Sequence, residues 1–103
     1  LSDEAIAKYF AQDLPAQDIR VVAATQGPAF SGIFDEKLTE AAYETKPSWY
    51  VVADKDGMIA PDAQRAMAKA INAKTTEVSA SHVVMLSQPD VVMRVILDAA
   101  GVK

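Results

Sequence analysis

The stretch PSWYVVADKDGMIAP, residues 47–61, decides the fold. Residues 48–53 are dense in aromatic and β-branched side chains and do not alternate apolar with polar positions, which is typical of a parallel-sheet strand buried on both faces. Residues 55–58, KDGM, predict a turn. Pro61 suits the first turn of a helix, which we expect to run to about Ala70 with Ala63, Ala66, Met67 and Ala70 on its apolar face.

A second strand and a second helix follow in the same order. TTEV at residues 75–78 predicts a short strand, and SASH at residues 79–82 predicts a loop. Pro89 opens a terminal helix whose apolar stripe we expect to comprise Val92, Val95, Ile96 and Ala99. Alternating strands and helices predict an α/β fold, in which parallel strands are joined by right-handed crossovers.

The first 46 residues have a different, helical character. Ser2 can cap a first helix, in which Ala5, Ile6, Tyr9 and Phe10 recur at helical spacing. Pro15 suits the start of a second helix with Ile19, Val22 and Ala23 on one face, and Gly27-Pro28 ends it. We expect a loop over residues 27–34 and a short polar helix over residues 35–44. The chain therefore divides into residues 1–46 and residues 47–103.

Composition narrows the class of protein. The chain has 103 residues, of which 50% are hydrophobic, so we expect one modest folded domain. Its net charge of -4 provides no basic surface for the phosphates of a nucleic acid. The sequence has no cysteine, which fits a reducing compartment, and we expect the protein in the cytoplasm with no membrane partner. Met58, Met67, Met85 and Met93 are expected to fill the core, and we expect no metal site.

Two residues that can carry chemistry follow the two predicted strands. Asp56 comes after the first strand, and His82, the single histidine, comes after the second. Functional groups in parallel sheets gather at the carboxyl ends of the strands, so both side chains should project from one edge. An imidazole can accept and return a proton near neutral pH, and a carboxylate on its other nitrogen fixes the tautomer. A satisfied loop histidine beside an ordinary Asp-Gly turn is an equally open interpretation of these residues.

Two longer stretches resemble a known family. PSWYVVADKDGMIAPDAQRAMA at residues 47–68 and SHVVMLSQPDVV at residues 81–92 are similar to the C-terminal part of an α/β-hydrolase. The likeness is to small bacterial esterases and non-haem chloroperoxidase-like members, related in pattern to plant methylesterases and hydroxynitrile lyases. It implies the C-terminal portion of that fold, with residues 47–103 carrying the acid and the histidine. Residues 1–46 resemble the end of the helical cap that covers the active site in this family.

The resemblance also implies roles for individual residues. Asp56 resembles the acid of the catalytic triad and His82 the base, with Asp54 as a nearby alternative acid. The family order of nucleophilic serine, acid and histidine agrees with Asp56 preceding His82. The spacing of Asp56 to Ile59 and Pro61 fits the family turn better than that of Asp54. No dissociable cofactor is implied.

The nucleophile has no counterpart in this sequence. Family members carry it on a G-x-S-x-G turn, and the chain has no such motif. Its serines are Ser2, Ser31, Ser48, Ser79, Ser81 and Ser87, and none has the required setting. We therefore expect the nucleophile upstream of Leu1, on a missing N-terminal half of the same fold. We also expect the isolated chain to fold poorly or to associate with that half, since two short parallel strands make a poor sheet alone.

These observations predict the C-terminal fragment of a serine-type α/β-hydrolase that hydrolyses carboxylic esters of small molecules through Asp56 and His82. A non-catalytic or degenerate α/β-hydrolase-like binding module is the alternative. A G-x-S-x-G turn upstream would favour the enzyme, and a natural start near Leu1 would favour the module.

Overall fold

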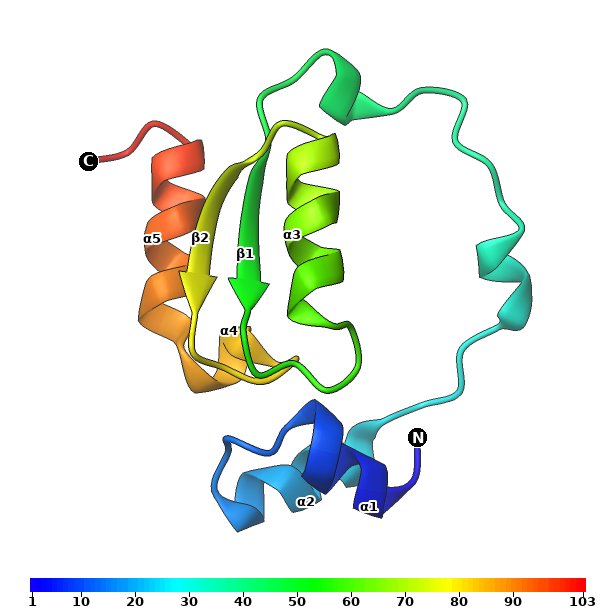
Figure 1. The fold of residues 1–103 in the computed structure, drawn as a ribbon. Helices are drawn as coiled ribbons and strands as arrows, with labels where there is room; N and C mark the ends of the chain where they lie inside the picture. Colours follow the sequence, from blue (N-terminus) through cyan, green and yellow to red (C-terminus); the bar gives the residue numbers. More distant parts are fainter.

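The computed structural model describes every residue from Leu1 to Lys103 (Figure 1). The N-terminal part comprises the helical turn α1 (Asp3–Ala5), the π-helical turn η1 (Ile6–Phe10) and the helix α2 (Ala16–Thr25). A wide arc follows, with 3-10 turns at η2 (Ser31–Phe34) and η3 (Ala42–Glu44). The C-terminal part comprises β1 (Trp49–Ala53), α3 (Pro61–Ala70), β2 (Lys74–Val78), α4 (Val84–Ser87) and α5 (Pro89–Ala99).

The C-terminal part confirms the predicted α/β architecture. Strands β1 and β2 pair in parallel, with Trp49 opposite Lys74 at one end and Ala53 opposite Val78 at the other. Helix α3 connects the two strands, and α3 and α5 flank them on opposite sides (Figure 1). The carboxyl ends of both strands point toward the N-terminal helices, so the loops that follow the strands lie between the two parts (Figure 1).

The N-terminal helices are held on the loop after β2. Ser2 caps the first turn as predicted, since its Oγ accepts a hydrogen bond from the amide of Ala5 at 3.1 Å. Ile6 and Ala11 are buried against Val83, and the cluster is completed by partly buried Phe10, Leu14, Ile19, Val22 and Ala23. The predicted inner face of α2 is therefore confirmed. This small core fixes the N-terminal segment beside the strand ends.

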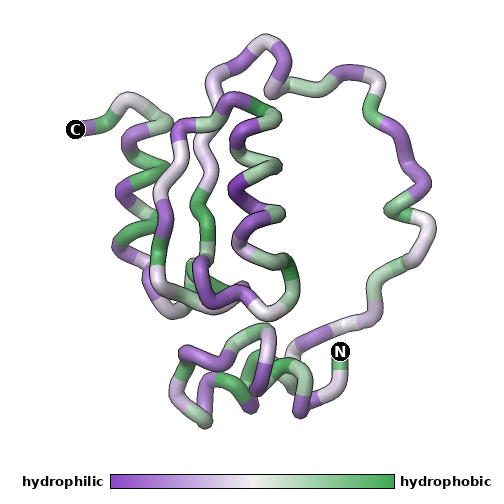
Figure 2. Tube along the Cα trace, in the orientation of Figure 1, coloured by the Kyte–Doolittle hydropathy of each residue, from purple (hydrophilic) through white to green (hydrophobic).

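The predicted polar helix over residues 35–44 is wrong. Only the single turn Ala42–Glu44 is helical there, and the predicted loop over residues 27–34 contains the 3-10 turn Ser31–Phe34. A short helix is stable only when its apolar face packs against a neighbour, and no other element covers the apolar residues of this segment. Figure 2 shows hydrophobic and hydrophilic residues interspersed along the arc. Phe34 and Leu38 are 85% and 81% exposed, so the arc is not packed on the rest of the chain.

The predicted apolar face of α3 is also wrong. The helix has the expected bounds, but Gln64 and Ala68 are its buried residues, while Ala63, Ala66, Met67 and Ala70 are exposed. The rotation of α3 about its axis agrees with two hydrogen bonds between Gln64 and Ala53 at the end of β1, one accepted and one donated by Gln64. On α5 the prediction is right for half-buried Val92 and Val95 and wrong for exposed Ile96 and Ala99.

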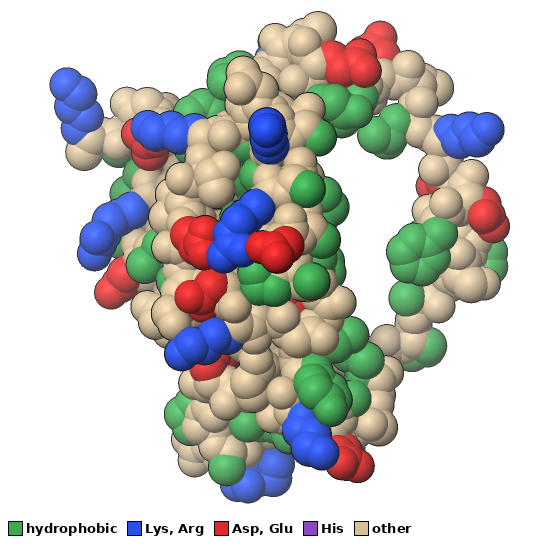
Figure 3. Space-filling view, viewed as in Figure 1, with side chains coloured by type: hydrophobic (Ala, Val, Ile, Leu, Met, Phe, Trp, Pro, Cys, Tyr) green, Lys and Arg blue, Asp and Glu red, His purple; other side chains and the backbone are tan.

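Strand β1 has a neighbour on one side only. Val52 and Ala53 are buried as predicted, but Trp49, Tyr50 and Val51 stay half-buried because nothing pairs with the other edge. Just 10 of the 103 residues are buried, which is a small core for this length. On the face shown in Figure 3, basic and acidic side chains are intermingled and do not gather by sign. None of the helices has both the length and the apolar character needed to span a membrane.

Candidate active site

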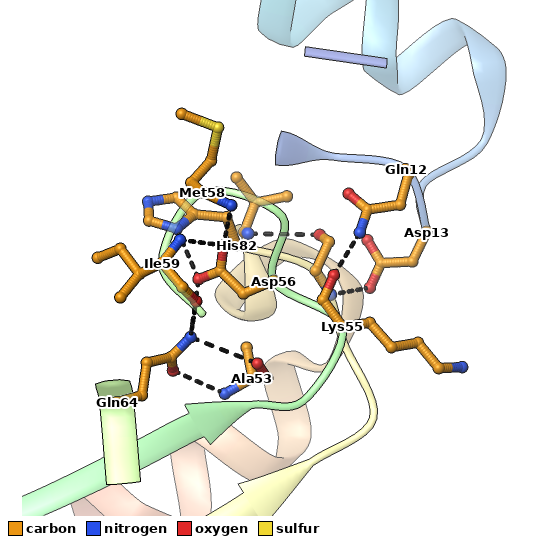
Figure 4. Close-up of polar contacts among 11 residues, drawn as sticks. Gln12, Asp13, Ala53, Lys55, Asp56, Met58, Ile59, Gln64 and His82 are labelled. Carbon is orange, nitrogen blue, oxygen red and sulfur yellow. Dashed lines mark hydrogen bonds and ion pairs between the residues drawn. The ribbon is translucent and has the colours of Figure 1, made fainter. Parts of the chain in front are cut away.

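Asp56 and His82 meet at the edge of the sheet, as the positions of the two strands predict. His82 Nδ1 lies 2.8 Å from Asp56 Oδ2, a hydrogen-bonding distance (Figure 4). The ladder continues beyond the strands, since the amide of Asp54 donates to the carbonyl of Val78 and that of Lys55 to the carbonyl of Ala80. These bonds hold the loops after β1 and β2 side by side, and the acid and the imidazole come together as a result.

The Asp56 carboxylate is fixed on both of its oxygens. Oδ1 accepts hydrogen bonds from the backbone amides of Met58 at 2.7 Å and Ile59 at 3.1 Å. Oδ2 accepts one from Gln64 Nε2 at 3.0 Å in addition to its contact with His82. The Asp56 side chain is only 5% exposed. Asp56 therefore does two things: one oxygen closes the turn before α3, and the other faces His82. The geometry is compatible both with an ordinary Asp-Gly turn and with a triad-like pair.

His82 keeps one side of its ring free. The ring of Phe10 lies beside it, with centroids 4.9 Å apart and planes inclined by 35°. The His82 side chain remains 33% exposed, and Nε2 points away from Asp56 (Figure 4). No group of the chain hydrogen-bonds to Nε2. When Nδ1–H donates to Asp56, the neutral ring presents Nε2 as an acceptor, which is the arrangement that a general base requires.

The structure separates Asp56 from the alternative acid. Asp54 is exposed, and its carboxylate makes no hydrogen bond to His82. Two positions later the chain has turned inward, which buries Asp56 against the imidazole. Of the two carboxylates, only Asp56 is in contact with the ring.

The N-terminal segment is tied to both loops of this site. The amide of Gly57 donates to the carbonyl of Tyr9 at 3.0 Å, and Gln12 Nε2 donates to the carbonyl of Lys55. A Cβ at Gly57 would lie 2.8 Å from three atoms of Tyr9, so the close approach requires glycine here. These contacts bring the end of η1 against the loop that carries Asp56.

Asp13 ties the same segment to the loop that carries His82. Its Oδ2 accepts a hydrogen bond from the amide of Ser81 at 2.8 Å (Figure 4). Partial burial raises the pKa of Asp13, but its hydrogen bonds, those with Ser81 foremost, together outweigh this effect and hold the pKa below the ordinary value. The charged carboxylate is therefore the form that the folded state favours.

Gln64 is the site residue that the sequence analysis missed. It is 4% exposed and contacts Asp56, Ala53 and Ile59. Its spacing to Ala68 was an available signal, because positions four apart share one helix face. Glutamine is seldom buried in proteins, so composition alone predicts that the apolar residues of α3 face the sheet and not Gln64.

A hollow of about 300 Å³ lies along the open edge of β1 and ends at the site. It is lined by Trp49, Tyr50, Val51, Ala53, Asp56, Ile59, Gln64, His82 and Val84. No serine hydroxyl hydrogen-bonds to His82, and the Ser81 side chain next to it is buried and accepts from the amide of Val83. No three His, Asp or Glu side chains gather into a possible metal site.

Parallel strands flanked by helices, with a histidine–carboxylate pair at the strand ends, are typical of an α/β enzyme. Comparison with known families identifies which one. A model of the α/β hydrolase family matches residues 2–95. The chain belongs to this family, and the match includes both the N-terminal helical part and the loops of Asp56 and His82. No curated protein and no solved structure matches the chain.

Proposed function

We propose that this chain provides the acid and the base of a serine-type hydrolase that acts on carboxylic esters of small molecules. The observation that carries the proposal is the contact of His82 Nδ1 with a buried carboxylate while Nε2 points outward. Membership of the α/β hydrolase family supports it. We place the nucleophile on a serine outside these 103 residues, because no serine hydroxyl within them hydrogen-bonds to His82.

The reaction follows from the orientation of the imidazole. The serine Oγ attacks the ester carbonyl carbon while its proton passes to His82 Nε2. The tetrahedral intermediate collapses, the bond from the acyl carbon to the alcohol oxygen breaks, and Nε2–H protonates the leaving alcohol. Water then attacks the acyl-enzyme, gives a proton to Nε2, and the serine takes that proton back as the carboxylic acid leaves. Asp56 holds Nδ1–H throughout and stabilises the imidazolium at each proton transfer.

We expect the part of the enzyme that carries the serine to pack on the open edge of β1. The unpaired strand and the hollow beside it end at His82, so a further strand in the same sheet would approach the imidazole. Phe10 packs against the imidazole and leaves Nε2 free. A serine carried at the end of such a strand could reach Nε2 without disturbing the contact between Asp56 and Nδ1.

The test is hydrolysis of a series of p-nitrophenyl esters by the full-length polypeptide. Asp56→Asn and His82→Gln are expected to lower kcat by about 10⁴-fold while KM changes little. Asp54→Asn is the matched control, because this exposed carboxylate lies in the same loop without touching His82. Normal turnover in His82→Gln, or an equal loss in Asp54→Asn, would contradict the proposed roles. Absence of ester hydrolysis in the wild type, with ligand binding in the hollow, would favour a degenerate binding module.

A further inference from the structure

Gln64 is a buried polar side chain on α3, whose other buried residue is Ala68. It lies at the fourth position of α3 and is 4% exposed. A buried amide without partners is costly, so its donors and acceptor must be satisfied within the protein. The position of those partners shows what the side chain holds together.

The Gln64 amide binds the end of β1 through both its oxygen and its nitrogen. Oε1 accepts a hydrogen bond from the amide of Ala53 at 3.0 Å, and Nε2 lies 3.4 Å from the carbonyl of Ala53 (Figure 4). The side chain thus pairs with the last residue of β1 as a neighbouring strand would. Because an N–H donor faces Oε1, the orientation of the amide is fixed and Nε2 must point toward the acid.

The nitrogen of the Gln64 amide also binds the turn that carries Asp56. Gln64 Nε2 donates to Asp56 Oδ2 at 3.0 Å and to the carbonyl of Ile59 at 2.8 Å. Oδ2 is the oxygen that faces His82 Nδ1, whereas Oδ1 is held by backbone amides. Gln64 is therefore the only side chain besides His82 that fixes this oxygen. Without it, the carboxylate could rotate about its Cβ–Cγ bond and move Oδ2 away from the imidazole.

We infer that Gln64 is a positioning residue, which joins the end of β1 to Asp56 and so aligns Asp56 Oδ2 with His82 Nδ1. Its effect is to keep the proton of the neutral imidazole on Nδ1 and leave Nε2 free to act as a base. The inference deepens the proposed function and rests on it for the catalytic consequence. The alignment itself can be measured without a substrate.

The test is the tautomer of His82, measured by nitrogen NMR on histidine-labelled full-length polypeptide at a pH where the ring is neutral. The signal of His82 is identified by its absence in His82→Gln. The wild type is expected to carry the proton mainly on Nδ1. Gln64→Met keeps the length and burial of the side chain but removes both hydrogen-bonding groups, so it should shift the proton toward Nε2, the tautomer that a histidine side chain prefers in water. It should also lower kcat by about 10- to 100-fold with little change in KM, the size of effect typical of losing a hydrogen-bond partner that orients a histidine.

Gln88→Met is the matched control, since the exposed Gln88 side chain makes no hydrogen bond. It should keep the tautomer and the kcat of the wild type. A folded Gln64→Met protein with the wild-type tautomer would overturn the role of Gln64 alone. A wild type with its proton mainly on Nε2 would overturn the Asp56–His82 pair itself, and the role of Gln64 with it.

A second measurement covers the case in which Gln64→Met does not fold. The side-chain amide protons of Gln64 in the wild type are expected to exchange slowly with water, because they are buried between Asp56 and Ile59. Asp56→Asn should shift their resonances and speed their exchange, while Asp54→Asn should not. Unchanged Gln64 amide signals in Asp56→Asn would overturn the inference.

Discussion

The contact between Gly57 and Tyr9 gives the sharpest test of how the N-terminal segment is held. A Cβ at residue 57 would lie 2.8 Å from Tyr9 Cα, Cβ and O, and two of these are backbone atoms that cannot swing aside. Gly57→Ala must push the segments apart, and such overpacking costs about 1–3 kcal/mol. The separation also breaks the hydrogen bond from the Gly57 amide to the Tyr9 carbonyl, worth about 1 kcal/mol. We expect the free energy of unfolding to fall by about 2–4 kcal/mol in total.

Urea unfolding of the protein measures this loss, and Gly27→Ala is the matched control. A Cβ at residue 27 would meet nothing within 4 Å, and the backbone there is not in the left-handed region. Gly27→Ala should therefore be neutral or stabilise by about 0.4–1 kcal/mol, because alanine restricts the unfolded chain. If Gly57→Ala unfolds at the same urea concentration as Gly27→Ala, the close approach of η1 to the acid loop is refuted.

Further predictions concern the core and the response to pH. Ile6→Ala, at a side chain 1% exposed, should lower the free energy of unfolding by about 2–5 kcal/mol; a loss as small as that of exposed Val21→Ala would argue against the core around Val83. The lowered pKa of Asp13 means that its carboxylate contributes stability fully above the ordinary carboxyl pKa, and that this contribution is lost as the pH falls through the folded-state value. Asp13→Asn should therefore make the free energy of unfolding less dependent on pH below about pH 4. If that dependence is unchanged, the contact between Asp13 and Ser81 is not its source.

The sequence predicts the C-terminal part well because local signals and tertiary environment agree there. Pro61 and Pro89 begin α3 and α5, and the dense apolar run of residues 49–53 forms β1. Strand ends of a parallel pair must meet at one edge, so the proximity of Asp56 and His82 followed from order alone. The side chain that aligns them was not predictable in this way. Gln64 is buried through four hydrogen bonds to Ala53, Asp56 and Ile59, and no periodicity of polar and apolar residues encodes such bonds.

The errors fall where the chain has no neighbour to pack against. The arc over residues 27–46 is not packed on the rest of the chain, so nothing stabilises a helix over residues 35–44. The face of α3 comprising Ala63, Ala66, Met67 and Ala70 is apolar but exposed, and one edge of β1 is unpaired. Patterning predicts what a residue could bury, whereas burial itself depends on elements that must be present to cover it.

The central claim is that His82 activates a serine, and the rate of modification by a fluorophosphonate probe tests it most directly. The probe reacts with an activated serine without requiring knowledge of the substrate. The full-length wild type should be labelled on one serine. His82→Gln should keep the unfolding curve of the wild type, and its labelling rate should fall by at least about a thousandfold. Equal labelling rates in the wild type and His82→Gln would contradict the account.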